Sequence, residues 1–184
     1  IVIWTTTPWT IPGNRALAYN NEIDYVAINI NQVSENSIAQ ENQIIIVSEI
    51  LLEDICSQCG ITEYDVKAKL KGYELKGSIA KHPMADAGYD YPVPLLDADY
   101  VTIEQGTGFV HIAPGHGPED YQLAHLKHEI EVPDTVNEDG TLMEHLPIFS
   151  GFHVLRDNLK IAEIISEHKG LIGIGSLTHS YPHS

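Results

Sequence analysis

The alternation of apolar and polar positions predicts a chain built mainly from short strands. β-Branched and apolar residues fill several stretches of strand length, and between residues 66 and 71 apolar side chains alternate with lysines, which predicts one buried face and one solvated face. Prolines at positions 83, 92 and 94 are expected in the connections between strands. The predicted strands cover residues 25–30, 43–48, 66–71, 75–81, 100–104, 108–112 and 171–177.

Helical patterns are fewer. A short helix is expected over residues 50–56, and a second begins at Pro118 and reaches about residue 128, because proline suits the first helical position. A third, over residues 154–169, has apolar residues at helical spacing and ends before Gly170. Many short strands with two or three helices predict a mainly β, α+β fold, with a closed or nearly closed β-barrel core decorated by helices and insertions.

Length and charge limit the function classes. The 184 residues suffice for one domain with a full core, and 10 Lys and Arg against 26 Asp and Glu give a net charge of −16. This charge repels nucleic acids and anionic membranes, so a nucleic-acid substrate would be held mostly by other parts of a larger protein. No apolar run approaches the ~20 residues of a membrane span, and the chain starts at Ile1 without a signal-peptide pattern. We expect residues 1–184 to be a single domain excised from a longer protein, cytoplasmic, monomeric and not bound to a membrane.

The first candidate for chemistry is a run of three threonines, residues 5–7, between Trp4 and Trp9. Hydroxyl groups can bind an ester carbonyl or a water molecule, and the aromatic side chains can shield such a site from solvent. The same residues also suit an ordinary strand that Pro8 ends. Composition alone favours the ordinary strand.

The second candidate is the segment from Gly106 to Tyr121. Side-chain alternation places Phe109 and His111 on one face of the predicted strand, and the helix that starts at Pro118 brings Asp120 back toward that strand. Taken singly, the histidine suits a hydrogen-bonded core position and the carboxylate suits the positive end of a helix dipole. Their arrangement predicts that the imidazole and the carboxylate face one cavity.

Metal binding is a weaker interpretation at two places. Cys56 and Cys59 form a single Cys-x-x-Cys, which is too few ligands for a structural zinc, and the following Gly60 indicates a helix end rather than the helix start of a redox site. We predict core packing there. A second possible ligand set has a spacing that matches no established metal motif. It consists of His111, His116, Glu119 and Asp120.

Three segments together resemble the editing domain inserted in isoleucyl-tRNA synthetase, which has relatives in valyl- and leucyl-tRNA synthetases. They are residues 4–12 with Asn14, residues 106–121 and residues 179–183, so the resemblance spans essentially the whole chain. Relatives of the valyl and leucyl type usually have an arginine where this chain has Thr7. The isoleucyl assignment follows from that difference.

The resemblance implies hydrolysis of valine wrongly attached to isoleucine tRNA, and of valyl-adenylate. An apolar pocket distinguishes valine from isoleucine, which differ by one methylene, by only about 1–3 kcal/mol, and isoleucyl-tRNA synthetase is itself the standard example of this magnitude. A second site is therefore needed that admits valine for hydrolysis and excludes the larger isoleucine. The implied partners are the aminoacylated 3′ end of tRNA(Ile) and the catalytic body of the parent synthetase. No cofactor is implied, and Ser184 stands where many relatives have a zinc-binding cysteine, so no metal is assigned.

The resemblance also implies roles for individual residues. Asp120 would anchor the α-ammonium group of the substrate, and His111 would form the pocket wall that excludes isoleucine. The threonines would hold the ester and the attacking water, and Asn14 would support the terminal adenosine or the loop. Since no nucleophile pair is evident, direct attack by a positioned water is expected, with the general base unassigned. The implied catalytic residues are Asp120, Thr5, Thr6 and Thr7. The implied substrate-binding residues are His111, Asn14, Trp4 and Thr10.

Three classes of function remain open from the sequence. The first is an editing hydrolase of the isoleucyl, valyl or leucyl type. The second is a free-standing hydrolase of small esters, or a metalloenzyme, on the same barrel. The third is a non-catalytic barrel that binds a ligand or a partner. The threonine run together with Asp120 favours the first class over the third, and a metal assay separates the first from the second.

Overall fold

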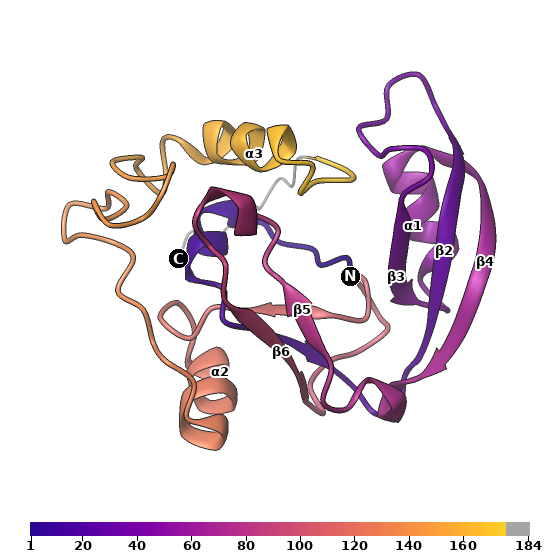
Figure 1. Ribbon diagram of the computed structural model, residues 1–184, viewed down its shortest axis with the longest axis horizontal. Coiled ribbons are helices and arrows are strands. Elements are labelled where there is room, and N and C mark those ends of the chain that lie inside the picture. Colours follow the sequence, from indigo (N-terminus) through magenta and orange to yellow (C-terminus); the bar gives the residue numbers. More distant parts are fainter. Residues whose placement is uncertain (176–184) are drawn as a thin grey trace, which may run out of the picture.

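The computed structural model describes residues 1–175, and its strands form two separate sheets (Figure 1). In the four-stranded sheet, β1 (Ala16–Tyr19) pairs in parallel with β6 (Pro92–Asp97) and antiparallel with β7 (Val110–Ile112). The strand β5 (Ile79–Lys81) pairs antiparallel with the other side of β6, which gives the order β5-β6-β1-β7. All four side chains of β1 are buried, so this short strand lies at the centre of the fold.

The second sheet has three antiparallel strands in the order β3-β2-β4. The strand β2 (Asp24–Val33) lies between β3 (Ile44–Ser48) and β4 (Ile61–Lys71), and the helix α1 (Leu52–Cys59) packs on this sheet. Isoleucine and valine side chains of β2 and β3 form a core with α1. The helix ends at Gly60, whose positive φ of 68° is the left-handed conformation that glycine adopts readily.

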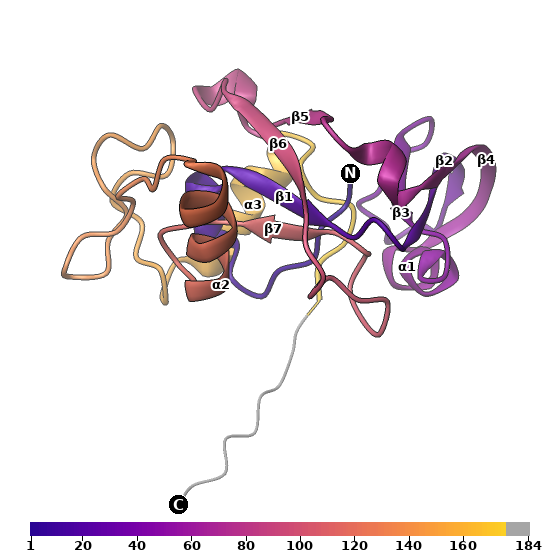
Figure 2. The ribbon, with the colours of Figure 1, turned by 90° about the horizontal axis from the view of Figure 1, so that it is seen from below.

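Of the two remaining helices, one packs on the four-stranded sheet and the other packs on η1 and the loops beside it. The helix α2 (Pro118–Tyr121) continues into a π-type turn, η4 (Gln122–Leu126), and packs on the face of β1 that carries Ala16 and Ala18. The helix α3 (Asn158–Glu167) packs against the N-terminal 3-10 turn η1 (Pro8–Gly13). Figure 1 shows α3 and α2 at opposite ends of the molecule, and in Figure 2, seen from below, α2 lies in front of α3. The 3-10 turns are η1 (Pro8–Gly13), η2 (Gly72–Leu75) and η3 (Ala85–Ala87).

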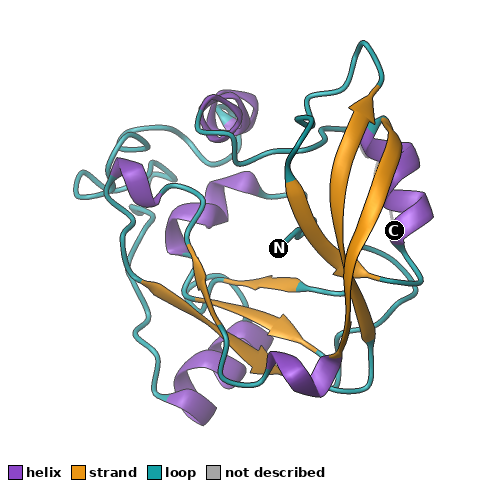
Figure 3. Ribbon diagram, turned by 45° about the vertical axis from the view of Figure 1, so that its right-hand side comes forward, coloured by secondary structure: helices purple, strands orange, loops and turns teal. Residues whose placement is uncertain are grey.

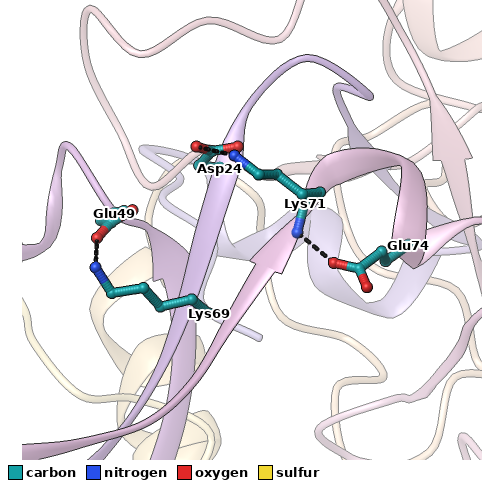
Figure 4. Close-up of polar contacts among 5 residues, drawn as sticks. All are labelled: Asp24, Glu49, Lys69, Lys71 and Glu74. Carbon is teal, nitrogen blue, oxygen red and sulfur yellow. Dashed lines mark hydrogen bonds and ion pairs between the residues drawn. The ribbon is translucent and has the colours of Figure 1, made fainter.

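Ion pairs at the outer strand β4 are exposed. Lys71 Nζ lies 2.8 Å from the carboxylate of Asp24, directly across the strand pair, and Lys69 pairs with Glu49 (Figure 4). The backbone N–H of Lys71 also donates to Glu74, at 2.7 Å, where β4 ends (Figure 4). Exposed pairs contribute about 0–1 kcal/mol each, so these pairs add little to the stability of the fold.

The expected closed or nearly closed barrel is wrong, because the described residues form two open sheets. Figure 3 shows the two groups of strands joined by loops rather than by further pairing. Single hydrogen bonds join β3 to segments that lie outside both sheets instead. The N–H of Val2 donates to Ile46 O at 3.2 Å, and the N–H of Ser48 donates to Thr107 O at 2.8 Å. Two isolated bonds of this kind do not continue a ladder from one sheet edge to the next.

Most of the predicted elements are present, with shifted ends. Strands lie at the expected places in β2, β3, β4, β5 and β7, and the helices α1, α2 with η4, and α3 match the three expected helices. The strand expected over residues 100–104 is a loop, and residues 171–175 form no strand. Residues 176 and 177 of that last expected strand, and the motif at residues 179–183, lie outside the described residues.

Two strand assignments need correction for physical reasons. The pattern predicts one buried face for residues 66–71, but Val66 is 50% exposed, because only the first residues of β4, Ile61 and Tyr64, pack in the core with α1. Pro92 and Pro94 lie inside β6 rather than in a connection. The N–H of Leu95 donates to Ser78 O, so alternate N–H groups face β5 and the proline nitrogens face away from it. On that other side, pairing with β1 begins only at Leu95.

Cys56 is buried in the core of α1, and Cys59 is partly buried at its end, as the sequence predicted. No helix among residues 1–175 is both long and apolar enough to cross a membrane.

Candidate active site

The threonine run forms a hydrogen-bonded turn rather than the end of a strand. Pro8 starts η1, and Thr10 donates both its N–H, at 3.0 Å, and its hydroxyl, at 2.9 Å, to the carbonyl oxygen of Thr7. The N–H of Thr7 in turn donates to the hydroxyl of Thr5 at 3.0 Å. The hydroxyls of Thr5 and Thr7 are 3.3 Å apart, so two of the three threonines present their oxygens together.

His111 lies on β7 with both ring nitrogens hydrogen-bonded. Its Nδ1 is 2.6 Å from the side-chain nitrogen of Asn14, and its Nε2 is 2.9 Å from the hydroxyl of Thr10. The Asn14 nitrogen can only donate, so Nδ1 accepts and the ring proton lies on Nε2. The Thr10 hydroxyl accepts from Nε2 and donates to Thr7 O. The hydrogen bonds from Asn14 through His111 and Thr10 to Thr7 therefore all donate in the same direction. The imidazole is therefore fixed in one tautomer.

Burial and the protein's own charges keep this imidazole neutral. Burial, followed by the neighbouring His82 and His116, lowers the pKa of His111 to about 4. A proton on Nδ1 would also meet the N–H of Asn14, which needs an acceptor there. A neutral ring with both nitrogens occupied is poorly suited to remove a proton, and it is well suited to serve as a rigid wall.

Asp120 lies at the start of α2 and is bonded to the far end of β7. Its Oδ2 accepts the backbone N–H of Ala113 at 2.9 Å, and Ala113 directly follows the last residue of β7. Burial raises the pKa of Asp120, the Ala113 hydrogen bond opposes that rise, and Glu119 adds to it. The structure records no hydrogen bond to Oδ1 within the described residues. That oxygen is available to a cationic group.

The loop between β7 and α2 packs on η1. His116 Nε2 lies 2.6 Å from the hydroxyl of Thr135, and its ring contacts Trp9 edge-on with centroids 5.0 Å apart. A Cβ at Gly13 would lie 3.3 Å from that ring, so the glycine allows the loop to approach closely. Sequence reasoning named His116 only as a possible metal ligand, and it missed Thr135. A partner 19 positions away leaves no local pattern.

Some of the predicted site residues are in direct contact with one another, and others are not. Thr10, Asn14 and His111 are in direct contact, and Thr7 and Thr5 are linked to them through Thr10. Asp120 is linked only to the backbone of Ala113, two residues after His111. Thr6 is exposed and Trp4 is 51% exposed, and neither makes a side-chain hydrogen bond to the others within the described residues.

The alternative metal set is not gathered. Within residues 1–175, no three side chains from His, Cys, Asp and Glu lie close enough together to hold a metal ion. Both ring nitrogens of His111 have protein partners, and one oxygen of Asp120 has a backbone partner.

Comparison with known proteins gives a consistent result. The whole chain aligns with the isoleucine–tRNA ligase of Pelagibacter ubique at 46% identity over 184 residues, and with that of Gluconobacter oxydans at 39% identity over 194 residues. The chain spans only about a fifth (20%) of the length of each of these relatives. No family model matches the chain.

Among solved structures, the chain is similar to GlLeuRS-CP1, with a TM-score of 0.67 at 16% identity over 97% of this chain and 83% of that one. It is also similar to the editing domain of the P. knowlesi cytosolic leucyl-tRNA synthetase, with a TM-score of 0.64 at 13% identity over 90% of this chain and 80% of that one. Identities this low establish the fold alone. The chain is thus a homologue, over its full length, of one segment of the isoleucine–tRNA ligases, and it has the fold of the leucyl-tRNA synthetase CP1 editing domains.

Proposed function

We propose that this chain is the hydrolytic editing domain of an isoleucyl-tRNA synthetase, which deacylates valyl-tRNA(Ile) and hydrolyses valyl-adenylate. The observation that carries the proposal is the combination of two features, one on β7 and one on α2. His111 of β7 is held as a neutral wall by Asn14 and Thr10, and Asp120 of α2 bonds to the residue after β7 with one carboxylate oxygen and leaves the other without a protein donor in the described residues. Homology to isoleucine–tRNA ligases favours the isoleucyl type over the valyl and leucyl types.

In the proposed reaction the side chains bind and position the substrate and the water molecule. The Asp120 carboxylate would pair with the α-ammonium group of the aminoacyl ester, a charge-assisted contact that a sheltered site strengthens. The hydroxyls of Thr5 and Thr7 would hold a water molecule against the ester carbonyl. His111 would bound the side-chain pocket. Water would attack the ester carbonyl and the bond to the ribose oxygen would break, or the bond to the phosphate in valyl-adenylate. Since the nitrogens of His111 are occupied, the proton from the water would pass to that leaving oxygen or to solvent and not to this ring.

The partners follow from the same proposal. The domain would take the aminoacylated 3′ end of tRNA(Ile) or valyl-adenylate, and the catalytic body of the parent synthetase would supply most of the tRNA contacts. A net charge of −16 agrees with that division of labour. We propose no cofactor and no metal for the reaction, and a cytoplasmic location.

The test compares deacylation of valyl-tRNA(Ile) and isoleucyl-tRNA(Ile) by the full-length parent enzyme and two Asp120 variants. Wild-type enzyme should hydrolyse the valyl ester much faster than the isoleucyl ester. Asp120→Asn keeps an acceptor for the Ala113 N–H and removes the charge, whereas Asp120→Ala removes both. We expect both variants to lose about 100-fold or more in valyl hydrolysis, because an unpaired substrate ammonium loses a charge-assisted bond of several kcal/mol.

The asparagine variant decides between charge and loop support. If Asp120→Asn keeps wild-type activity while Asp120→Ala loses it, the carboxylate serves the loop and not the substrate. Equal hydrolysis of both esters by wild-type enzyme would contradict the proposed valine specificity. Circular dichroism of each variant checks that the fold is retained.

A further inference from the structure

One arginine occupies an unusual position beside the proposed site. The chain has only two arginines, Arg15 and Arg156, and Arg15 directly follows Asn14, whose side chain holds His111. Its Nη1 donates to Asn14 O at 2.8 Å and to the Tyr91 hydroxyl at 2.6 Å. The guanidinium carbon lies 4.2 Å from the centre of the Tyr91 ring. These contacts hold the partly buried guanidinium in one orientation.

This cation has no carboxylate partner in the part of the chain that the structure describes. The ion pairs found there all use lysines. Both of the oriented contacts of Arg15 come from Nη1, so within the described residues Nε and Nη2 keep N–H groups without a protein acceptor. In a chain with 26 acidic residues, a partly buried guanidinium that none of them pairs with points to an anion supplied from outside.

The surroundings of Tyr91 leave room for such an anion. Tyr91 lines an open hollow of about 340 Å³ between β5 and β6, together with Lys81, Asp90 and Pro92. Arg15 does not line this hollow itself but packs on the ring of Tyr91, at its edge. Lys81 adds a second positive charge, and its contact with Asp86, at 3.4 Å, is between two exposed side chains and is therefore weak. Asp90 is the one carboxylate that lines the hollow.

We propose that Arg15 binds a backbone phosphate of the single-stranded 3′ end of the tRNA, next to the pocket that receives the aminoacyl group. The inference rests on the proposed function. A guanidinium presents a planar fork of N–H groups that matches a phosphate, and a nucleic-acid strand offers one such anion per nucleotide. Since Arg15 and Asn14 are consecutive residues, a phosphate held by Arg15 would lie close to the wall formed by His111.

The experiment separates phosphate binding from bracing of the site. The full-length parent enzyme is prepared with Arg15→Gln, Arg15→Lys or Tyr91→Phe, and Arg156→Gln is the matched control because it removes the same charge at an exposed loop position. Each protein is assayed on valyl-tRNA(Ile) and on the ester valyl-adenosine, which has no phosphate. Binding of a single-stranded RNA with the sequence of the tRNA 3′ end is measured over a range of salt concentrations.

We expect Arg15→Gln to lower kcat/KM for valyl-tRNA(Ile) about tenfold, mainly through KM, and to leave valyl-adenosine hydrolysis unchanged. The slope of log affinity against log salt for the RNA should decrease by about 0.7, the value for one phosphate contact on a single strand. Arg15→Lys keeps the charge without the fork and should lie between wild type and Arg15→Gln. Arg156→Gln should change neither measurement. Tyr91→Phe should keep the ratio of the two hydrolysis rates.

Three results would overturn the phosphate site. Equal losses on both substrates would show that Arg15 only braces Asn14. Equal effects of Arg156→Gln would show that the overall charge matters rather than the position. An unchanged salt slope in Arg15→Gln would show that no phosphate contact is lost. If wild-type enzyme hydrolyses neither valyl-tRNA(Ile) nor valyl-adenosine, the proposed hydrolysis is refuted. If Arg15→Gln then still lowers the slope of log RNA affinity against log salt, the phosphate site is supported independently.

Discussion

The stability of this fold should depend on pH through His82, a buried histidine that neighbours His111. Its side chain is 2% exposed, its Nδ1 accepts the N–H of Met84 at 3.0 Å, and its Nε2 donates to Ile11 O at 3.0 Å. Burial lowers the pKa of His82 to about 4, and the bond to Ile11 opposes this only in part. Protonation would turn Nδ1 of His82 from an acceptor into a donor, and it would then face the N–H of Met84.

The sign of the pH effect follows from the two states. The unfolded chain has a histidine pKa of about 6.5, so it binds the proton first as the pH falls, and the folded chain resists protonation down to about pH 4. The contribution of His82 is therefore fully present above about pH 6.5 and is lost as the pH falls toward 4. Between pH 7.5 and pH 4.5, this linkage lowers the free energy of unfolding by about 2.5 kcal/mol.

The perturbation that tests this value is His82→Gln, whose amide can still donate to Ile11 O but does not titrate. At pH 7.5 the variant should be less stable than wild type by about 1–3 kcal/mol, because the Met84 N–H loses its acceptor. At pH 4.5 the difference should shrink by about 2.5 kcal/mol, because only the unfolded wild-type chain is stabilised by a proton on this histidine. Urea unfolding followed by circular dichroism at several pH values measures both proteins.

An exposed histidine provides the control. His128→Gln should leave the pH dependence of the free energy of unfolding unchanged, because the His128 side chain is in solvent. A difference between wild type and His82→Gln that stays constant from pH 7.5 to pH 4.5 would refute the reasoning. The same would follow if His128→Gln altered the pH dependence as much as His82→Gln does.

Two further predictions concern the proposed site. His111→Ala should open the pocket, so that the parent enzyme gains hydrolysis of isoleucyl-tRNA(Ile) while valyl hydrolysis persists, and side-by-side deacylation rates measure this; a variant in which both rates fall together contradicts the wall. Alanine at Thr5, Thr6 and Thr7 together should cost much more than any single replacement, because groups that act on one transition state are not additive. Turnover of valyl-tRNA(Ile) close to wild type in the triple variant would show that the threonines are only structural.

Local patterns predicted the elements whose side chains alternate, and they failed where the fold depends on distant partners. The strand β1 has only four residues and is buried on both faces, so it has no alternation to detect. The strand β6 contains two prolines, which local rules place in connections, and only its one-sided pairing with β5 and its late start against β1 allow them. Whether sheet edges close into a barrel depends on pairings between distant segments, which strand number alone does not determine.

The same division applies to the site. Alternation along the strand placed Phe109 on the face opposite Val110 and Ile112, and these residues pack in two different cores, as predicted. The contact of Arg15 with Tyr91, by contrast, joins residues 76 positions apart, and no spacing in the sequence indicates it. Asn14 was named only through a resemblance, whereas its bond to His111 arises because β1 and β7 are neighbours.

The hydrogen bonds around His111 bear directly on how a wall of this kind could select by size. Excluding one methylene requires that the wall does not yield, since the substrate would gain only about 1–3 kcal/mol from the extra contact. Moving the ring would break its bonds to Asn14 and Thr10, and each bond is worth about 0.5–1.5 kcal/mol, with a further cost for any buried group left without a partner. The resistance of the wall is therefore at least as large as the gain that would displace it. A bare apolar side chain at position 111 would have no such bonds, so under the proposed function the polar brace, and not the size of the imidazole alone, sets the selectivity.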